Sequence, residues 1–187
     1  MVRLFLIVLM NYKRMILQLR NLKITIFLNK PLFSRENSTK KILDKFRIEN
    51  YQIATTVYKH TPSNVHVTGI KNIRDISKVK YLIEEKFCKI RNIRFDCAFL
   101  SCKLNKRINL EKTVRNLCKL KKYFTSYEPE IFSSIIIKPK VPKECPTCFL
   151  FESGSMIVLV GSKSIQRIIP FLNDILKNIS EKKNGGL

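Results

Sequence analysis

Apolar residues recur along two stretches of the chain with the spacing of an amphipathic helix. They lie three or four residues apart from Ile73 to Phe87 and again from Ile165 to Ile179. This spacing places the apolar side chains of each stretch on one face of a helix. Each stretch is therefore predicted to be a helix that packs one apolar stripe against a neighbouring layer.

Segments rich in β-branched and aromatic residues precede each predicted helix. They cover Ile53–Tyr58 in the first half of the chain, and Ile135–Ile137 and Cys148–Phe151 in the second. Turn-forming residues follow at Thr61-Pro-Ser-Asn64 and at Glu152-Ser-Gly-Ser155. Strands joined by hairpins are therefore expected in both halves.

Farther upstream, each half is predicted to open with a strand, over Leu22–Asn29 and over Cys97–Leu104. A helix is expected at Leu110–Leu120, with Asn109 as its N-cap. In the first half, Ser34–Phe46 is the corresponding helix candidate.

The two halves carry a short internal repeat. Val65–Lys71 and Ile157–Lys163 match at an offset of 92 residues, and each reads as strand, glycine turn and helix start. The segment Lys30–Tyr58 is shorter than its counterpart Lys106–Phe151, so the first copy lacks about one strand or one helix. The pattern predicts an α+β fold in which two repeats join their strands into one curved antiparallel sheet, with helices on one face only. The opposite face would then be open to a ligand.

The predicted organisation is an N-terminal extension over residues 1–20, a first repeat over 21–90, a second over 91–180 and a flexible tail over 181–187. The apolar run Leu4–Met10 is too short to span a bilayer and is not followed by a signal-peptide cleavage site. No membrane association through a spanning segment is expected.

Charge narrows the choice of partner. The chain has 36 Lys and Arg against 14 Asp and Glu, a formal net charge of +22, spread from Arg3 to Lys183. Such a density favours polyanions because neutralised phosphates release condensed counterions. Nucleic acid is the first expectation, and an anionic membrane surface is the alternative.

The six cysteines suggest no disulfide framework, because nothing indicates a secreted context. Cys145-Pro-Thr-Cys148 is a lone CxxC, and a zinc site would need two further ligands, for which only His60 and His66 are available. A turn that carries two thiols fits better than a zinc or redox site. No phosphate-binding glycine loop or paired acids appear, so no enzyme activity, metal or cofactor is expected.

One segment carries a specific resemblance. Phe124-Thr-Ser-Tyr-Glu-Pro-Glu-Ile-Phe132 is similar to Ser-Ser-Tyr-Glu-Pro-Glu-Leu-Phe of the TATA-binding protein family. Val141-Pro-Lys143, Phe149-Leu-Phe-Glu-Ser-Gly154 and Val160-Gly-Ser-Lys163 resemble the motifs that follow it in that family. The resemblance runs from about Ile93 to Ile179; in the first half it is clear only around Val67-Thr-Gly-Ile-Lys71 and the helix after it.

The resemblance implies a saddle whose helices lie on the convex face and whose concave sheet binds the DNA minor groove, where aromatic wedges kink the duplex. Phe132, Phe151 and Tyr58 fall on wedge positions, and Phe46 is the candidate for the fourth. It also implies phosphate contacts by Lys71, Lys138, Lys143 and Lys163. The groove floor would comprise Thr56, His66, Thr68, Cys97, Phe149 and Val158.

Two features set this sequence apart from the family pattern. His66 would make contact with A·T base edges depend on pH. The family's central asparagines are matched by Cys97 and a position near Thr25, neither of which donates as an amide does. Strict preference for a TATA-type element is therefore not expected.

Tyr127, Glu128 and Glu130 fall where the family contacts transcription factor IIB, so a partner of that kind is implied. The resemblance thus predicts a transcription initiation factor that acts as a monomer on double-stranded DNA, in the nucleus or at a viral transcription site. A scaffold of the same fold that recruits transcription proteins without gripping DNA is the alternative. A DNA-repair module is a weaker option, because no glycosylase-like domain follows.

Overall fold

The protein is described from a computed structural model that covers residues 17–36, 41–141 and 146–180. Nine strands form one open sheet in the order β2-β3-β4-β1-β5-β9-β8-β7-β6. The strands are β1 (Gln18–Leu28), β2 (Lys41–Ile48), β3 (Tyr51–Tyr58), β4 (Asn64–Ile70), β5 (Ile90–Lys103), β6 (Tyr123–Ser126), β7 (Ser134–Pro139), β8 (Thr147–Phe151) and β9 (Ser155–Gly161). The α-helices in the described residues are α2 (Ile76–Lys86), α3 (Leu110–Lys119) and α4 (Ile168–Asn178), and short 3-10 turns η1 (Ile73–Asp75) and η2 (Ile165–Arg167) precede α2 and α4.

The chain divides into two compact units, Leu19–Ala98 and Phe99–Leu187, the second joined by Leu17 and Gln18. The boundary falls inside β5, whereas the sequence suggested a division at residues 90 and 91. Strand β1 begins at Gln18, within the predicted extension.

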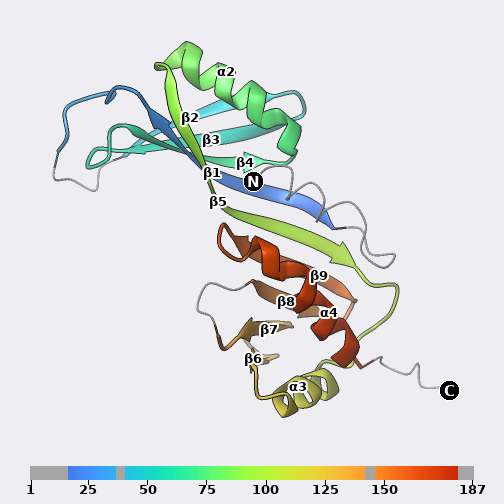
Figure 1. Cartoon of the computed structure of the whole chain (residues 1–187). Helices are drawn as coiled ribbons and strands as arrows, with labels where there is room; N and C mark the ends of the chain where they lie inside the picture. Colours follow the sequence, from blue (N-terminus) through green and yellow to red (C-terminus); the bar gives the residue numbers. More distant parts are fainter. Residues whose placement is uncertain (1–16, 37–40, 142–145, 181–187) are drawn as a thin grey trace. The chain divides into compact units, whose positions relative to one another are not determined.

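In the unit Leu19–Ala98, the strands have two different sides. Antiparallel pairing aligns Thr55 with Val67 and Val57 with Val65. Helix α2 lies across this side of the strands (Figure 1). Thr55 is the buried polar member of this row, and the buried apolar side chains include Ile24, Ile26, Ile53, Val57, Val65, Val67, Val79 and Ile83. Residues of the opposite side, such as Thr56 and His66, are only partly covered.

The unit Phe99–Leu187 repeats this division. One side of its strands is fully buried, with Ile135, Ile137, Cys148, Leu150, Met156, Val158 and Val160 as its members. Helix α4 contributes Ile168, Leu172 and Ile175 to the same core, and it lies along β8 and β9 (Figure 1). The hydroxyl of Tyr123 on β6 donates to Asp174 on α4, and its ring lies 5.9 Å from that of Phe171. This unit therefore has one covered side and one open side.

The predicted hairpins and the helices predicted after Ile73, Ile165 and Asn109 are confirmed. So is the Asn109 cap, whose side chain accepts a hydrogen bond from the Lys112 backbone N–H at 2.9 Å. The predicted helix over Ser34–Phe46 is wrong. Residues 41–48 form β2, which pairs with β3 without interruption from Lys41↔Tyr58 to Ile48↔Tyr51. Eight residues of continuous antiparallel ladder satisfy the backbone of this segment, and that long-range pairing overrides its local helix propensity.

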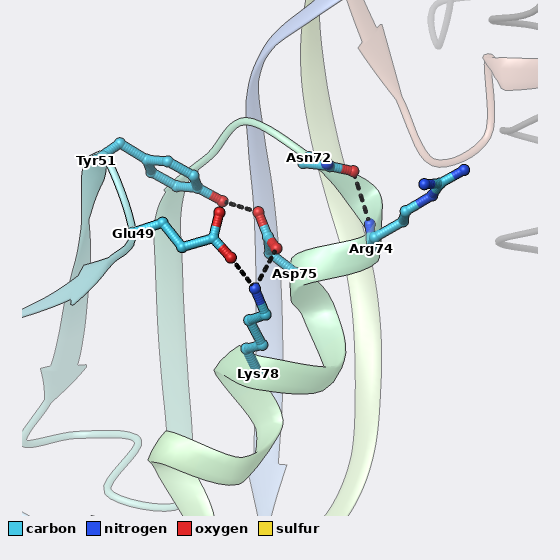
Figure 2. Close-up of polar contacts among 6 residues, drawn as sticks. All are labelled: Glu49, Tyr51, Asn72, Arg74, Asp75 and Lys78. Carbon is cyan, nitrogen blue, oxygen red and sulfur yellow. Dashed lines mark hydrogen bonds and ion pairs between the residues drawn. The ribbon is translucent and has the colours of Figure 1, made fainter.

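A polar cluster ties the β2–β3 turn to the start of α2 (Figure 2). The Tyr51 hydroxyl donates to the buried Asp75 carboxylate at 2.6 Å, and Lys78 pairs with Asp75 at 3.6 Å and with Glu49. Burial, and then the Asp75 hydrogen bond, raise the pKa of Tyr51 to about 12. The hydroxyl therefore keeps its proton, and remains a donor, throughout the neutral pH range.

Removal of this donor is expected to weaken the fold. Tyr51→Phe leaves a buried carboxylate without its neutral partner and lowers the free energy of unfolding by about 1–2 kcal/mol, as measured by urea denaturation. Tyr81→Phe is the matched control, because Tyr81 is 66% exposed on α2 and its loss changes stability little. Equal stability of the two variants would contradict a role for this cluster.

Candidate nucleic-acid interface

Three phenylalanines gather on the open side of the unit Phe99–Leu187. Pairing aligns Phe151 with Ser134 and Phe149 with Ile136, which places both rings on the side opposite the buried Leu150. The Phe132 ring lies edge-on to both, at 6.1 Å from Phe149 and 6.0 Å from Phe151. Phe132 is nevertheless 42% exposed. The structure thus brings together the two predicted wedge residues of this unit and one predicted floor residue.

The same side carries further apolar and basic groups. Ile157 is aligned with Phe149 and is 36% exposed. On the neighbouring strands Phe124 is aligned with Lys138, both exposed, and the Lys140 ammonium lies 5.5 Å from the Phe124 ring centroid. An exposed apolar surface with lysines at its margin is unusual unless it binds a partner.

Val158, predicted to lie on the groove floor, lies on the other side. It is aligned with Cys148 and is 0% exposed, within the core beneath α4. Side chains alternate along a strand, and the Glu152–Ser155 turn sets the β8–β9 register so that Ile157 and Leu159 face the open side instead.

On the open side of the unit Leu19–Ala98, three predicted residues lie together. Tyr58, Thr56 and His66 share this side, since Thr56 is aligned with His66. The Tyr58 ring lies 5.5 Å from His66, edge-on, and 5.5 Å from His60. Thr68, aligned with Ala54, continues the same row.

Phe46, the fourth predicted wedge, is on the covered side of its strand. It is aligned with the buried Ile53, and the Lys86 ammonium of α2 lies 5.0 Å from its ring centroid. The open side of β2 instead presents Leu43, which is 63% exposed and aligned with Thr56. Side chains alternate along a strand, so Phe46 and Leu43 point to opposite sides, and Leu43 is the one that β2 presents on the open side.

Two amides that are not among the predicted site residues also lie on this side. Asn21 lies four residues before Thr25 on β1, and Asn92 lies four residues before Asp96 on the neighbouring strand β5. Residues an even number apart in a strand face the same side. The Asn21 Oδ1 accepts from the Gly69 N–H at 2.8 Å, and the Asn92 Oδ1 accepts from the Ile93 N–H at 2.8 Å. Each NH₂ group is thereby left as a donor.

A second internal repeat could have revealed these residues. Leu19-Arg-Asn-Leu-Lys23 and Ile90-Arg-Asn-Ile-Arg94 have the same pattern, at the same distance before Thr25 and Asp96. Matching the family's amide positions to Thr25 and Cys97 predicts no donors, whereas Asn21 and Asn92 supply amides on this side. Cys97 itself is partly buried, and burial raises the pKa of its thiol.

The predicted phosphate contacts are distributed around the units. Lys138 and Lys163 are exposed, on β7 and in the turn after β9. Lys71 is exposed after β4 with its ammonium 5.6 Å from the Tyr51 ring centroid. Lys143 lies outside the described residues. The phosphate contacts of these four lysines stay predictions.

The segment from Tyr127 to Phe132 forms a compact exposed turn. The backbone N–H groups of Ile131 and Phe132 donate to the Glu128 carbonyl at 3.0 and 2.8 Å. The carboxylates of Glu128 and Glu130 and the 79% exposed Ile131 therefore face solvent together.

The described residues hold no cluster of three His, Cys, Asp or Glu side chains suited to a metal ion. Cys148 is buried in β8, and burial raises the pKa of its thiol; Cys145 lies outside the described residues. Over the same described part of the chain, none of the helices combines the length and the apolar character that a bilayer crossing requires.

Comparison with known proteins identifies the family. The sequence model of "Transcription factor TFIID (or TATA-binding protein, TBP)" matches residues 87–182, about half of the chain. The chain belongs to the TATA-binding protein family. That family comprises transcription factors and no enzymes, which agrees with the resemblance noted from the motifs.

Two individual proteins are also similar to this chain. TATA-box-binding protein-like 1 of Entamoeba histolytica is 28% identical over 124 residues, which cover 66% of this chain and 52% of the relative. The chain thus spans about half the length of that relative. The solved structure of Methanococcus jannaschii TBP has a TM-score of 0.61 at 16% identity and covers 88% of this chain and 99% of its own. This second likeness shows a TATA-binding-protein-like fold.

The two sides of β9 can be tested through stability. Val158→Ala removes buried methyl groups and is expected to lower the free energy of unfolding by roughly 1–3 kcal/mol. Ile157→Ala, one residue away on the open side, should cost clearly less, since its side chain is partly in solvent already. Thermal and urea unfolding of both variants measure the difference; the reverse order would mean that the register is shifted by one residue.

Proposed function

We propose that this protein is a transcription initiation factor that binds and bends double-stranded DNA through the minor groove. The observation that carries the proposal is the cluster of the exposed Phe132 with the half-buried Phe149 and Phe151 on the open side of its unit. Apolar wedges inserted between base pairs unstack them and kink the duplex, which needs rigid rings held at the surface.

Charge and backbone supply the remaining requirements. The net charge of +22 provides sequence-independent attraction to phosphates. Lysines beside the open sides, such as Lys41, Lys45 and Lys138, suit contacts that position a duplex without reading it. Tyr58 and Leu43 offer apolar contact in the unit Leu19–Ala98, with Tyr58 as its wedge.

The proposed arrangement is the saddle of the family, with helices on the convex face and the open sides forming the concave face. The first repeat would be the shorter one: among the described residues between β1 and β2, 29–36, there is no helix, whereas α3 follows β5. The protein would act as a monomer on DNA, in the nucleus or at a viral transcription site.

Asn21 and Asn92 bear on sequence preference. Adenine N3 and thymine O2 in the minor groove are acceptors, and the NH₂ groups of these amides are donors on the open side. These donors support recognition of A·T pairs at the part of the DNA site that the two amides face. Cys97 and Thr25, which were matched to the family's asparagines from the sequence, do not supply these donors.

Bending is the decisive measurement. The double variant Phe132→Ala/Phe151→Ala is expected to keep weak, salt-sensitive binding to an A·T-rich duplex but to lose most of the kink, because phosphate attraction remains while the wedges are gone. Resonance energy transfer between dyes at the two duplex ends reports the bend.

Phe46→Ala is the control, since Phe46 is on the covered side of β2 and its removal leaves bending unchanged. Unaltered bending in the double variant would exclude these wedges. If the wild-type protein binds no duplex even at about 50 mM salt, where phosphate contacts are strongest, the scaffold function is correct.

The exposed turn suggests the protein partner. Glu128 and Glu130 are carboxylates in a strongly basic chain, beside the exposed Ile131, and they fit a basic partner of the transcription factor IIB kind. Glu128→Lys/Glu130→Lys is expected to weaken capture of such a partner on DNA at least tenfold while leaving bending intact.

Glu111→Lys is its control, because Glu111 is an exposed carboxylate on α3, away from the turn in sequence. A supershift assay with pre-bound DNA measures recruitment. Equal recruitment by both variants would show that the turn is not the docking site.

A further inference from the structure

A polar network crosses the open side of the unit Leu19–Ala98. The Thr25 hydroxyl on β1 donates to Asp96 Oδ2 on β5 at 2.6 Å. The Thr25 hydroxyl oxygen also lies 3.0 Å from His66 Nδ1 on β4. Asp96 also pairs with Arg94 at 3.0 Å. Thr25 itself is fully buried by these neighbours. A charged network is unexpected on a surface otherwise suited to an apolar groove floor.

This network fixes the tautomer of His66. The Thr25 hydroxyl has one proton, and that proton is given to Asp96. The contact between Thr25 and His66 must therefore run from the Nδ1–H of the ring to the Thr25 oxygen. In the neutral ring the proton is then on Nδ1, and Nε2 carries a lone pair.

The surroundings keep the ring neutral. Burial lowers the pKa of His66 below its usual value, and the nearby charges of Lys23, Arg94 and His60 lower it further, against an opposing effect of Asp96. At neutral pH the imidazole is thus an acceptor at Nε2.

The acceptor is on the side proposed to face DNA. His66 is aligned with Thr56 on β3 and with Thr25 on β1. Within the described residues, the contact of Nδ1 with Thr25 is the only hydrogen bond that the ring makes. A·T pairs present only acceptors in the minor groove, whereas guanine adds the N2 amino donor. The Nε2 lone pair can therefore accept a hydrogen bond from the guanine amino group of a G·C pair, whereas an A·T pair offers it no donor.

We propose that His66 is a specificity-determining residue that selects a base pair with a minor-groove amino group, held in the accepting tautomer by the Thr25–Asp96 relay. The inference rests on the proposed minor-groove function and adds to it. The DNA site would then combine A·T pairs opposite the Asn21 and Asn92 amides with a G·C pair opposite His66.

Modified bases isolate the amino group. A short A·T duplex receives one 2,6-diaminopurine·T pair at each position in turn, which adds only the amino group; replacing G·C by inosine·C removes only that group. Wild-type protein is expected to bind the amino-bearing duplex roughly three- to tenfold more tightly at one or two adjacent positions, the worth of one hydrogen bond.

Because the amino group also changes the stiffness of DNA, variants are compared on the same duplexes. Thr25→Val removes the hydroxyl that joins His66 to Asp96, so the His66 proton is no longer held on Nδ1. The preference for the amino-bearing duplex should then fall to near zero. Thr125→Val, the same substitution on β6 where Thr125 is aligned with the buried Ile137 on the covered side, should retain it.

Acidification provides the independent readout. Protonation of His66 at acidic pH makes Nε2 a donor, which should reverse the preference towards A·T in the wild type; the charged and titratable groups around His66 are Lys23, Asp96, Arg94 and His60, with the Tyr58 ring beside it. Binding without any dependence on the amino group would overturn the role of His66 and leave minor-groove binding intact. Failure to bind any duplex would overturn the proposed function as well.

Discussion

Burial of one side of each strand beneath the helices is the interaction on which the rest of the structure depends. Each fully buried Val or Ile contributes about 1.5–3 kcal/mol relative to an exposed one. Rows of such buried side chains run across neighbouring strands, as in the pairs β3–β4 and β8–β9. A slip of one residue would move a whole row into solvent, so the register is strongly fixed. The open side is a consequence: Phe149 and His66 face outward because Leu150 and Val67 must face inward.

Much of the fold could be predicted because its signals are local. The Asn109 cap and the helical spacing after Ile73 and Ile165 lie within one or two turns of chain. Which side a strand residue faces is less local, since it depends on turn length and irregularities. Between the pairs Leu22↔Ile70 and Ile24↔Val67, strand β4 has one more residue than β1, so its pairing is irregular there. When the two repeats are aligned on their glycines, equivalent residues before the glycine therefore face different sides of the sheet. The Val158 assignment failed for this reason.

Among the polar features of the open side, some could be predicted from local sequence and others depend on the strand order. Asn21 and Asn92 stand in two copies of one short motif, and comparison of the opening strands with each other would have found them. The contact of Thr25 with Asp96 joins residues 71 apart in sequence, and that of Thr25 with His66 joins residues 41 apart. Neither partner can be named until the strand order is known, because nothing in the sequence around Thr25 requires a carboxylate or an imidazole beside it.

The two end strands of the sheet, β2 and β6, are where another molecule could add a strand. An open sheet exposes unpaired backbone groups at its ends, which can template the addition of strands from other molecules. Strand β2 carries Lys41, Asp44, Lys45 and Arg47, and β6 has only four residues. The three positive charges of β2 outnumber Asp44, so a second copy that approached this strand would meet net repulsion, and β6 offers a ladder of only four residues. Charge on β2 and the shortness of β6 thus disfavour strand addition at the two ends of the sheet.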